Sequence, residues 1–118
     1  QVNSYRQHQI IFRYADAHLM KAEAMMRMGG DPTSMVNDLR GLREDTPDLA
    51  SVTEQTLLEE RARELFIEFW RRNDLVRFGQ FTAPWGLKEV SGDENMNLFP
   101  IPATALLSNP NLVQNPGY

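Results

Sequence analysis

Three glutamates spaced four residues apart, Glu60, Glu64 and Glu68, are the most evident candidates for chemistry in this chain. On a helix they share one face, and neighbouring carboxylates lie about 6 Å apart along the axis, from the rise of each residue. Two carboxylates on either side of a glycosidic bond are the catalytic groups of most glycoside hydrolases. The spacing therefore raises the hypothesis of a carboxylate-based glycosidase.

The same stretch also places arginines at helical spacing from these and neighbouring glutamates, which indicates surface ion pairs. The expected pairs are Glu59 with Arg63, Arg61 with Glu64, and Glu68 with Arg72. A charged helix face is ordinarily a solvated, ion-paired surface. We therefore assign the three glutamates to structure and expect no enzymatic activity. Asp74 and Arg77 follow the helix and predict an Arg–Asp network that fixes the adjoining turn.

Histidine, cysteine and serine, the other residue types that commonly form catalytic or metal-binding sites, indicate no such site in this sequence. His8 and His18 are ten residues apart, which is not a metal-ligand spacing on a helix. Cysteine is absent, so disulfides, thiolate catalysis and zinc–sulfur sites are excluded. The serines have no local base, and no glycine-rich phosphate loop is present. We expect no metal and no cofactor.

Trp85 is a different kind of candidate, because it stands between Pro84 and Gly86 in a stretch without helical periodicity. An indole in a loop either covers the core or offers a flat surface on which a sugar ring can stack. Large aromatic side chains are usually buried, so the core position is the preferred interpretation. Trp85 is nevertheless our candidate for direct contact with a ligand.

Helical segments must position these residues. Apolar residues at steps of three and four, from Ile11 to Met26, predict a helix over 10–28 that ends at Gly29 and Gly30. Asp31 as N-cap and Pro32 at the first helical position predict a second helix that continues to Arg43. Its inward-facing residues are predicted to be Met35, Val36, Leu39 and Leu42. These two helices resemble a tetratricopeptide-type hairpin, which must pack on neighbours to bury its apolar face.

Thr53 is the predicted cap of a third and longest helix over 54–72. Its apolar face is predicted to consist of Leu58, Ala62, Leu65 and Phe69, widened by Phe66 and Trp70. Gly79 ends the helical part. Residues 80–118 are rich in proline and asparagine and predict an irregular strap, with one short helical turn at 102–107 and minimal strand content. The apolar residues of the strap predict that it packs on the helices. The expected fold is all-α, one domain over 1–118 with a helical core at 10–79.

Composition narrows the functional classes. The chain has 118 residues, 42% of them hydrophobic and 24% charged, which is typical of one globular domain. A net charge of −4 gives no basic surface for nucleic acid. No apolar run is long enough to span a bilayer. The sequence starts at Gln1 without initiator methionine or signal peptide, which we interpret as a portion of a longer protein.

Three motifs resemble the C-terminal part of the SusD/RagB family, the glycan-binding lipoproteins of Bacteroidetes outer membranes. They are "FRYADAHLMKAEAMMRMGG", "EERARELFIEFWRRNDLVRFGQF" and "NLFPIPATALLSNPNLVQNPGY". The middle motif matches at Glu60, Arg61, Glu64, Leu65, Glu68, Arg71, Asp74, Leu75, Arg77 and Gly79. It departs from the family at Phe69, where the family usually has glycine, and at Arg72, where it commonly has tryptophan.

The resemblance implies a non-catalytic function. Family members are several times longer, carry an N-terminal lipidated cysteine, and sit as a lid over a TonB-dependent (SusC-like) outer-membrane transporter. They bind oligosaccharides at the cell surface for uptake, largely through loops upstream of this region. The expectation is that this segment is mainly scaffold, attached to the outer membrane only through a lipid anchor outside it. The alternative from the residues is a free-standing helical-repeat module for protein interaction.

Overall fold

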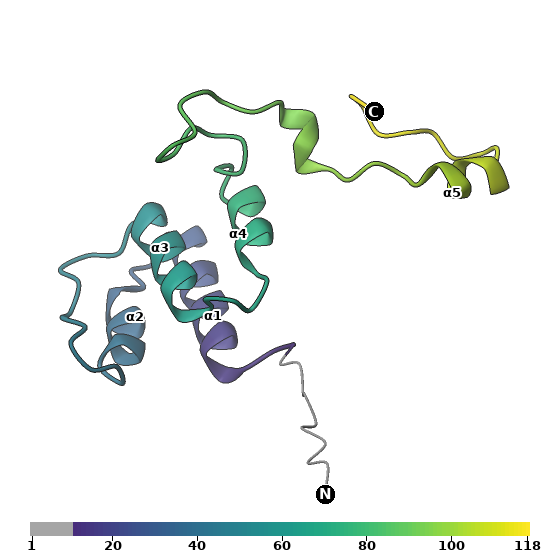
Figure 1. Cartoon of the computed structure of the whole chain (residues 1–118). Helices are drawn as coiled ribbons and strands as arrows, with labels where there is room; N and C mark the ends of the chain where they lie inside the picture. Colours follow the sequence, from purple (N-terminus) through teal and green to yellow (C-terminus); the bar gives the residue numbers. More distant parts are fainter. Residues whose placement is uncertain (1–10) are drawn as a thin grey trace, which may run out of the picture. The chain divides into compact units, whose positions relative to one another are not determined.

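The computed structural model describes residues 11–118, and in this range it is helical without a named strand (Figure 1). The elements are α1 (Tyr14–Arg27), α2 (Thr33–Arg40), α3 (Glu54–Glu64), α4 (Arg71–Arg77), a 3-10 helix η1 (Glu94–Asn97) and α5 (Ala103–Ser108). The described residues form two compact units, which divide after Asp74. The all-α prediction is confirmed.

The core of the first unit lies between α1, α2 and α3, because α1 contacts both of the other helices. Its buried apolar side chains are Ala15, Leu19, Ala22, Val36, Leu39, Leu57, Leu58 and Leu65. The predicted stripe of the first helix is confirmed from Ala15 to Ala22. Ile11 lies before the start of α1 and is exposed, contrary to the prediction. Residue 10, the predicted first residue of that helix, lies outside the described range.

Gly29 ends α1 as the sequence predicts, whereas α2 begins at Thr33, one residue later than predicted, with Pro32 in place of Asp31 at the N-cap position. Gly29 adopts φ +82° and its N–H donates to the Met26 carbonyl, so it ends α1 in the left-handed conformation that glycine tolerates. Asp31 Oδ1 accepts hydrogen bonds from the Thr33 amide at 2.9 Å and from the Thr33 hydroxyl at 2.5 Å. These bonds satisfy the first orphan amide of α2.

The second helix ends at Arg40, three residues earlier than predicted. The Thr46 hydroxyl lies 2.8 Å from the Arg40 carbonyl oxygen and 2.9 Å from that of Arg43, so its single O–H can bond to the carbonyls at the end of α2 and in the turn after it. Leu42, predicted to face the core, is therefore exposed in the turn.

The third helix begins as predicted but is much shorter. The Thr53 hydroxyl accepts from the Thr56 amide at 3.2 Å, and the Thr56 hydroxyl accepts from the Thr53 amide at 2.7 Å, which forms a capping box. The predicted extent to residue 72 is wrong, because α3 ends at Glu64. Ile67 and Phe69 adopt φ of +66° and +65°, which no right-handed helix accommodates.

A separate short helix, α4, follows this turn. Because the chain turns at residues 65–70, Phe66 and Phe69 do not continue the apolar face of α3, and both are exposed, contrary to the prediction. Beyond α4, Gly79 adopts φ +66°, which confirms its predicted role at the end of the helical part.

Side chains hold the second unit together where regular backbone pairing is missing. Gln114 and Ile101 exchange two hydrogen bonds, with the Ile101 amide donating to Gln114 Oε1 at 2.7 Å and Gln114 Nε2 donating to the Ile101 carbonyl at 3.0 Å. Asn115 Nδ2 donates to the Phe99 carbonyl at 2.7 Å, and the Tyr118 hydroxyl to the Leu98 carbonyl at 2.9 Å. These contacts give residues 98–118 a defined conformation.

The short helix predicted at 102–107 is present as α5, whereas η1 has no counterpart in the prediction. The packing of the strap on the helical core stays a prediction. None of the helices in the described range is both long and apolar enough to cross a bilayer.

Candidate functional site

A buried ion-pair network joins α1, α3 and α4. Arg61 Nη2 donates to Asp16 Oδ1 at 2.9 Å, and Arg61 Nε lies 2.9 Å from Asp74 Oδ1. The exposed fractions of the Arg61, Asp16 and Asp74 side chains are 2%, 2% and 1%. The predicted Arg–Asp network at Asp74 is therefore present, and it includes Arg61. The guanidinium of Arg77, the arginine predicted for it, lies 5.4 Å from the centre of the Phe78 ring.

Glu60 is the most deeply buried of the three candidate glutamates, of which Glu60 and Glu64 lie on α3 and Glu68 lies in the turn after it. Its carboxylate accepts from Arg40 Nη1 at 2.5 Å and from Arg63 Nη2 at 2.8 Å. Arg40 itself is held by the Pro47 carbonyl, to which Nε and Nη2 donate at 3.1 and 2.7 Å. Glu60 therefore links α3 to α2 and to the loop that follows α2.

Glu64 lies between two arginines from other parts of the first unit. Arg13 Nη1 donates to Glu64 Oε1 at 2.6 Å, Arg13 Nη2 donates to the Glu64 carbonyl, and Arg43 Nη2 donates to Oε1 at 2.5 Å. Burial is the largest single influence on this carboxyl and raises its pKa. The hydrogen bonds and positive charges of Arg43 and Arg13 outweigh burial, so the pKa of Glu64 lies below its usual value.

Glu68 completes the row by binding the same arginine as Glu64. Arg13 Nε donates to both carboxylate oxygens of Glu68, at 2.8 and 2.9 Å. This bond is the largest cause of a raised pKa at the Arg13 guanidinium. A polar cleft of about 410 Å³ adjoins these groups, lined by Arg13, Arg43, Thr46, Glu60, Arg63 and Glu64. Each of the three glutamates thus accepts hydrogen bonds from arginine, as expected of structural residues.

The predicted partners within the helix are mostly replaced by partners from other elements. Glu59 and Arg63 do pair, at 4.0 Å, as predicted. Arg61 turns to the two aspartates instead of Glu64, and Glu68 takes Arg13 from the segment before α1. Arg71 Nη1 donates to the Leu58 carbonyl at 3.0 Å and so ties α4 back to α3. Residues 11–118 contain no cluster of His, Cys, Asp and Glu that could hold a metal ion.

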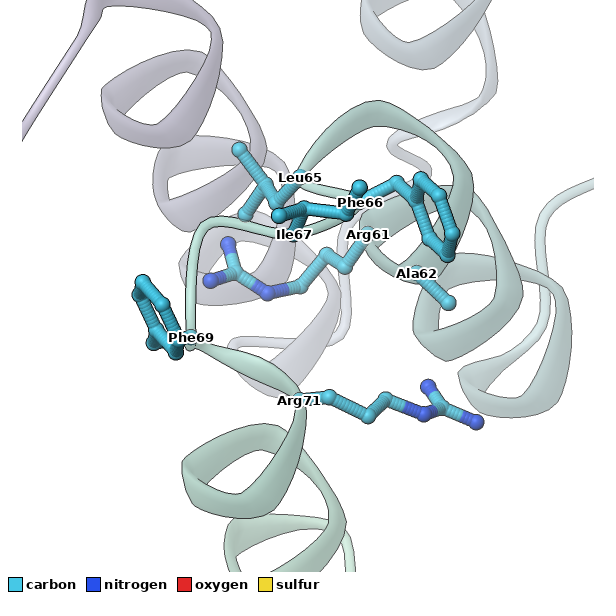
Figure 2. A pocket seen from close by; sticks show the side chains of 7 residues that line it. All are labelled: Arg61, Ala62, Leu65, Phe66, Ile67, Phe69 and Arg71. Carbon is cyan, nitrogen blue, oxygen red and sulfur yellow. The ribbon is translucent and has the colours of Figure 1, made fainter. Parts of the chain in front are cut away.

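An apolar hollow of about 440 Å³ lies beside the turn between α3 and α4 (Figure 2). It is lined by Arg61, Ala62, Leu65, Phe66, Ile67, Phe69 and Arg71. Figure 2 shows the Phe66 and Phe69 rings on opposite sides of the Arg61 side chain. The Arg61 guanidinium is already committed to Asp16 and Asp74, so the hollow offers mainly apolar surface.

Trp85 lies in the second unit on a tight turn, and its side chain is 67% exposed. The preferred interpretation, that it covers the helical core of the first unit, stays a prediction. Its amide donates to the Lys88 carbonyl at 2.9 Å, and the Lys88 amide donates to the Trp85 carbonyl at 2.7 Å. The exposed indole remains a candidate for ligand contact.

Sequence reasoning missed four charged residues that complete these networks, namely Arg13, Asp16, Arg40 and Arg43. Their partners are 20 to 55 residues away in the chain, so no local spacing reveals them. The available signal was that Arg13 and Asp16 both fall within the motif "FRYADAHLMKAEAMMRMGG".

Comparison of the sequence and the structure with known proteins identifies a protein family and individual relatives that this chain resembles. A family model described as "SusD family" matches residues 1–94. The starch-binding protein SusD of Bacteroides thetaiotaomicron is 42% identical over 92% of this chain, and a SusD-like protein of Formosa agariphila is 34% identical over 92%. The structure of Bacteroides fragilis NanU matches 93% of the chain with a TM-score of 0.68 and 30% identity. The chain spans only 21%, 24% and 27% of these proteins, respectively.

Proposed function

We propose, from the premise that this chain belongs to the SusD family, that it is part of a protein that binds glycan nutrients at the outer-membrane surface without catalysis. The observation that carries the proposal is the 42% identity to a starch-binding protein across 92% of the chain. We further propose that the full-length protein is lipid-anchored and delivers oligosaccharide to a TonB-dependent transporter.

Within that protein we assign the first unit to scaffold. Glu60, Glu64 and Glu68 are the groups that a glycosidase would need, and each accepts hydrogen bonds from arginine. A general acid must keep a proton near neutral pH, which requires a raised pKa. The pKa of Glu64 is lowered instead, which favours the unprotonated form. These contacts support a structural role over hydrolysis.

The test uses the natural full-length protein. Isothermal titration against a panel of soluble starch, other polysaccharides and their oligosaccharides should give saturable binding to at least one. Purification from the outer membrane of the source organism should recover a TonB-dependent barrel in the same complex. Absence of binding across the panel would refute glycan recognition. Recovery of the protein from the cytoplasm, without a barrel, would refute the proposed location and partner.

A further inference from the structure

The turn that carries Trp85 (the Trp85 turn, residues 81–92) has a defined backbone. The reciprocal bonds between Trp85 and Lys88 enclose two residues, Gly86 and Leu87. Gly86 has φ +46°, whereas Leu87 is not among the residues with positive φ. Glycine at the first central position is the pattern of a type II′ hairpin turn, one of the two preferred for a two-residue loop.

The Lys88 side chain holds the backbone of the segment that precedes Trp85. Its Nζ donates toward the carbonyls of Thr82, Ala83 and Phe81, at 3.0, 3.3 and 3.5 Å. The Gly92 amide also donates to the Thr82 carbonyl, at 2.7 Å, and closes the turn at its other end. An ammonium group has three N–H donors, and here all three can be used on backbone that leads into Trp85.

This bonding leaves the indole of Trp85 exposed on a fixed backbone. We propose that the Trp85 turn is a preformed platform on which the Trp85 indole stacks against a sugar ring of the bound glycan, with Lys88 as its positioning residue. The proposal rests on the proposed function and names the site of one contact. An extended protein contact is the competing explanation, and the experiment below distinguishes the two.

The physical argument is one of preorganisation. An indole offers a large flat apolar surface with few rotatable bonds, so little conformational entropy is lost when a ligand covers it. A ligand that meets a fixed loop also avoids the free energy of ordering that loop, which otherwise reduces affinity. The three carbonyl contacts of Lys88 supply this order before any ligand arrives. Gly86 supplies the backbone conformation that the turn requires.

Trp85→Ala in the natural full-length protein is the first test, with Leu87→Ala as its matched control. Leu87 is the adjacent central residue of the turn and is fully exposed, so its truncation changes the same loop without removing an aromatic face. Titration uses the glycan that the unsubstituted protein binds most tightly in the panel. We expect about a fivefold or greater loss of glycan affinity for Trp85→Ala, because this is the usual contribution of one aromatic contact to binding. Leu87→Ala should stay within twofold of the unsubstituted protein.

The role of Lys88 is tested with Lys88→Met and Lys88→Arg. Methionine keeps the apolar stem but removes the donors, so deuterium exchange at the amides of Trp85, Lys88 and Gly92 should become faster and glycan affinity should fall about threefold. Arginine retains donors that can reach the carbonyls and should restore most of the affinity. Equal affinity of Lys88→Met and the unsubstituted protein would refute the positioning role.

Three outcomes overturn the proposal in distinguishable ways. If the unsubstituted protein binds no glycan, the proposed function and this inference fail together. If it binds glycan and Trp85→Ala binds equally well, only the platform is wrong. If Trp85→Ala and Leu87→Ala both weaken the complex with the transporter barrel and leave glycan affinity unchanged, the turn is a protein contact instead.

Discussion

Replacing Arg61 by methionine removes a guanidinium that contacts two buried carboxylates, those of Asp16 and Asp74. Methionine keeps an unbranched apolar stem but is two atoms shorter than arginine, so the change removes the charge and leaves the place of the guanidinium unfilled. Loss of one partner from a buried ion pair costs about 3–5 kcal/mol, because the remaining charge stays desolvated. Arg61 serves both Asp16 and Asp74, each almost inaccessible to solvent, so we expect a loss of about 4 kcal/mol.

Arg63→Met is the matched control, since it makes the same substitution two residues along the same helix. The Arg63 side chain is 51% exposed, and exposed ion pairs contribute about 0.2–1 kcal/mol. Urea unfolding of the full-length protein, followed by circular dichroism, gives the free energy of unfolding of each variant. A loss for Arg61→Met that is within about 1 kcal/mol of the loss for Arg63→Met would refute the reasoning, since the buried network would then add little.

Neutralising Asp16 and Asp74, the partners of Arg61, checks independently whether unpaired buried charge causes the loss of stability. Adding Asp16→Asn and Asp74→Asn to Arg61→Met replaces two buried charges by amides, which cost less to desolvate. The triple variant should therefore be more stable than Arg61→Met alone. A triple variant that is less stable would show that the loss comes from packing instead of charge.

Three further predictions concern single residues, each measured by urea unfolding. Glu64 has a lowered pKa in the folded state, so its contribution is present above the unfolded value of about 4.5 and is lost as pH falls through the folded value. The stability difference between the unsubstituted protein and Glu64→Gln should shrink below that pH, and a constant difference would contradict it. Phe69→Gly should raise the free energy of unfolding by up to about 1.5 kcal/mol, because the left-handed conformation costs a non-glycine residue about 1–2 kcal/mol and the added chain entropy of glycine offsets about 0.5–1 kcal/mol of that gain. A clear loss of stability would show that the Phe69 ring is needed. Gly117→Ala should destabilise, because Gly117 has φ +88° and a Cβ there would lie 2.7 Å from the Asn95 side chain; unchanged stability would contradict this close packing.

The sequence predicted those features whose causes are local. The Gly29 turn, the Thr53 cap, the apolar stripe from Ala15 to Ala22 and the end at Gly79 each depend on residues within a few positions. Capping and glycine signals act over one helical turn, so they can be read without tertiary information. The family resemblance added what no local pattern contains, because three ordered motifs identified the chain's relatives.

The break between α3 and α4 shows where local reasoning stops. Residues 65–70, Leu-Phe-Ile-Glu-Phe-Trp, contain no glycine or proline and continue a helical apolar pattern. Yet the chain turns there, with Ile67 and Phe69 at positive φ. The turn brings Asp74 to Arg61 and Arg71 to the Leu58 carbonyl, contacts that offset an unfavourable backbone. The one signal available was Phe69, which occupies the position of the family's usual glycine.

The candidate site was predictable in outline but not in its partners. The assignment of the candidate glutamates to ion pairs followed from helical spacing, yet Glu64 and Glu68 both bind Arg13, more than fifty residues away in the chain. Such pairings depend on which helices pack together, and spacing within one helix carries no information on that. Exposure of Trp85 was likewise not readable, because a loop aromatic is compatible with either a covered or an exposed position.

Binding of a glycan without its cleavage is the central claim, and one experiment measures both parts. The full-length protein is titrated calorimetrically with the oligosaccharide it binds best in the panel, and the sugar is then recovered from the same sample and analysed by chromatography. The account predicts saturable binding and quantitative recovery of the intact oligosaccharide. Absence of binding to every glycan, or new reducing ends that disappear in the Glu60→Gln and Glu64→Gln variants, would contradict it.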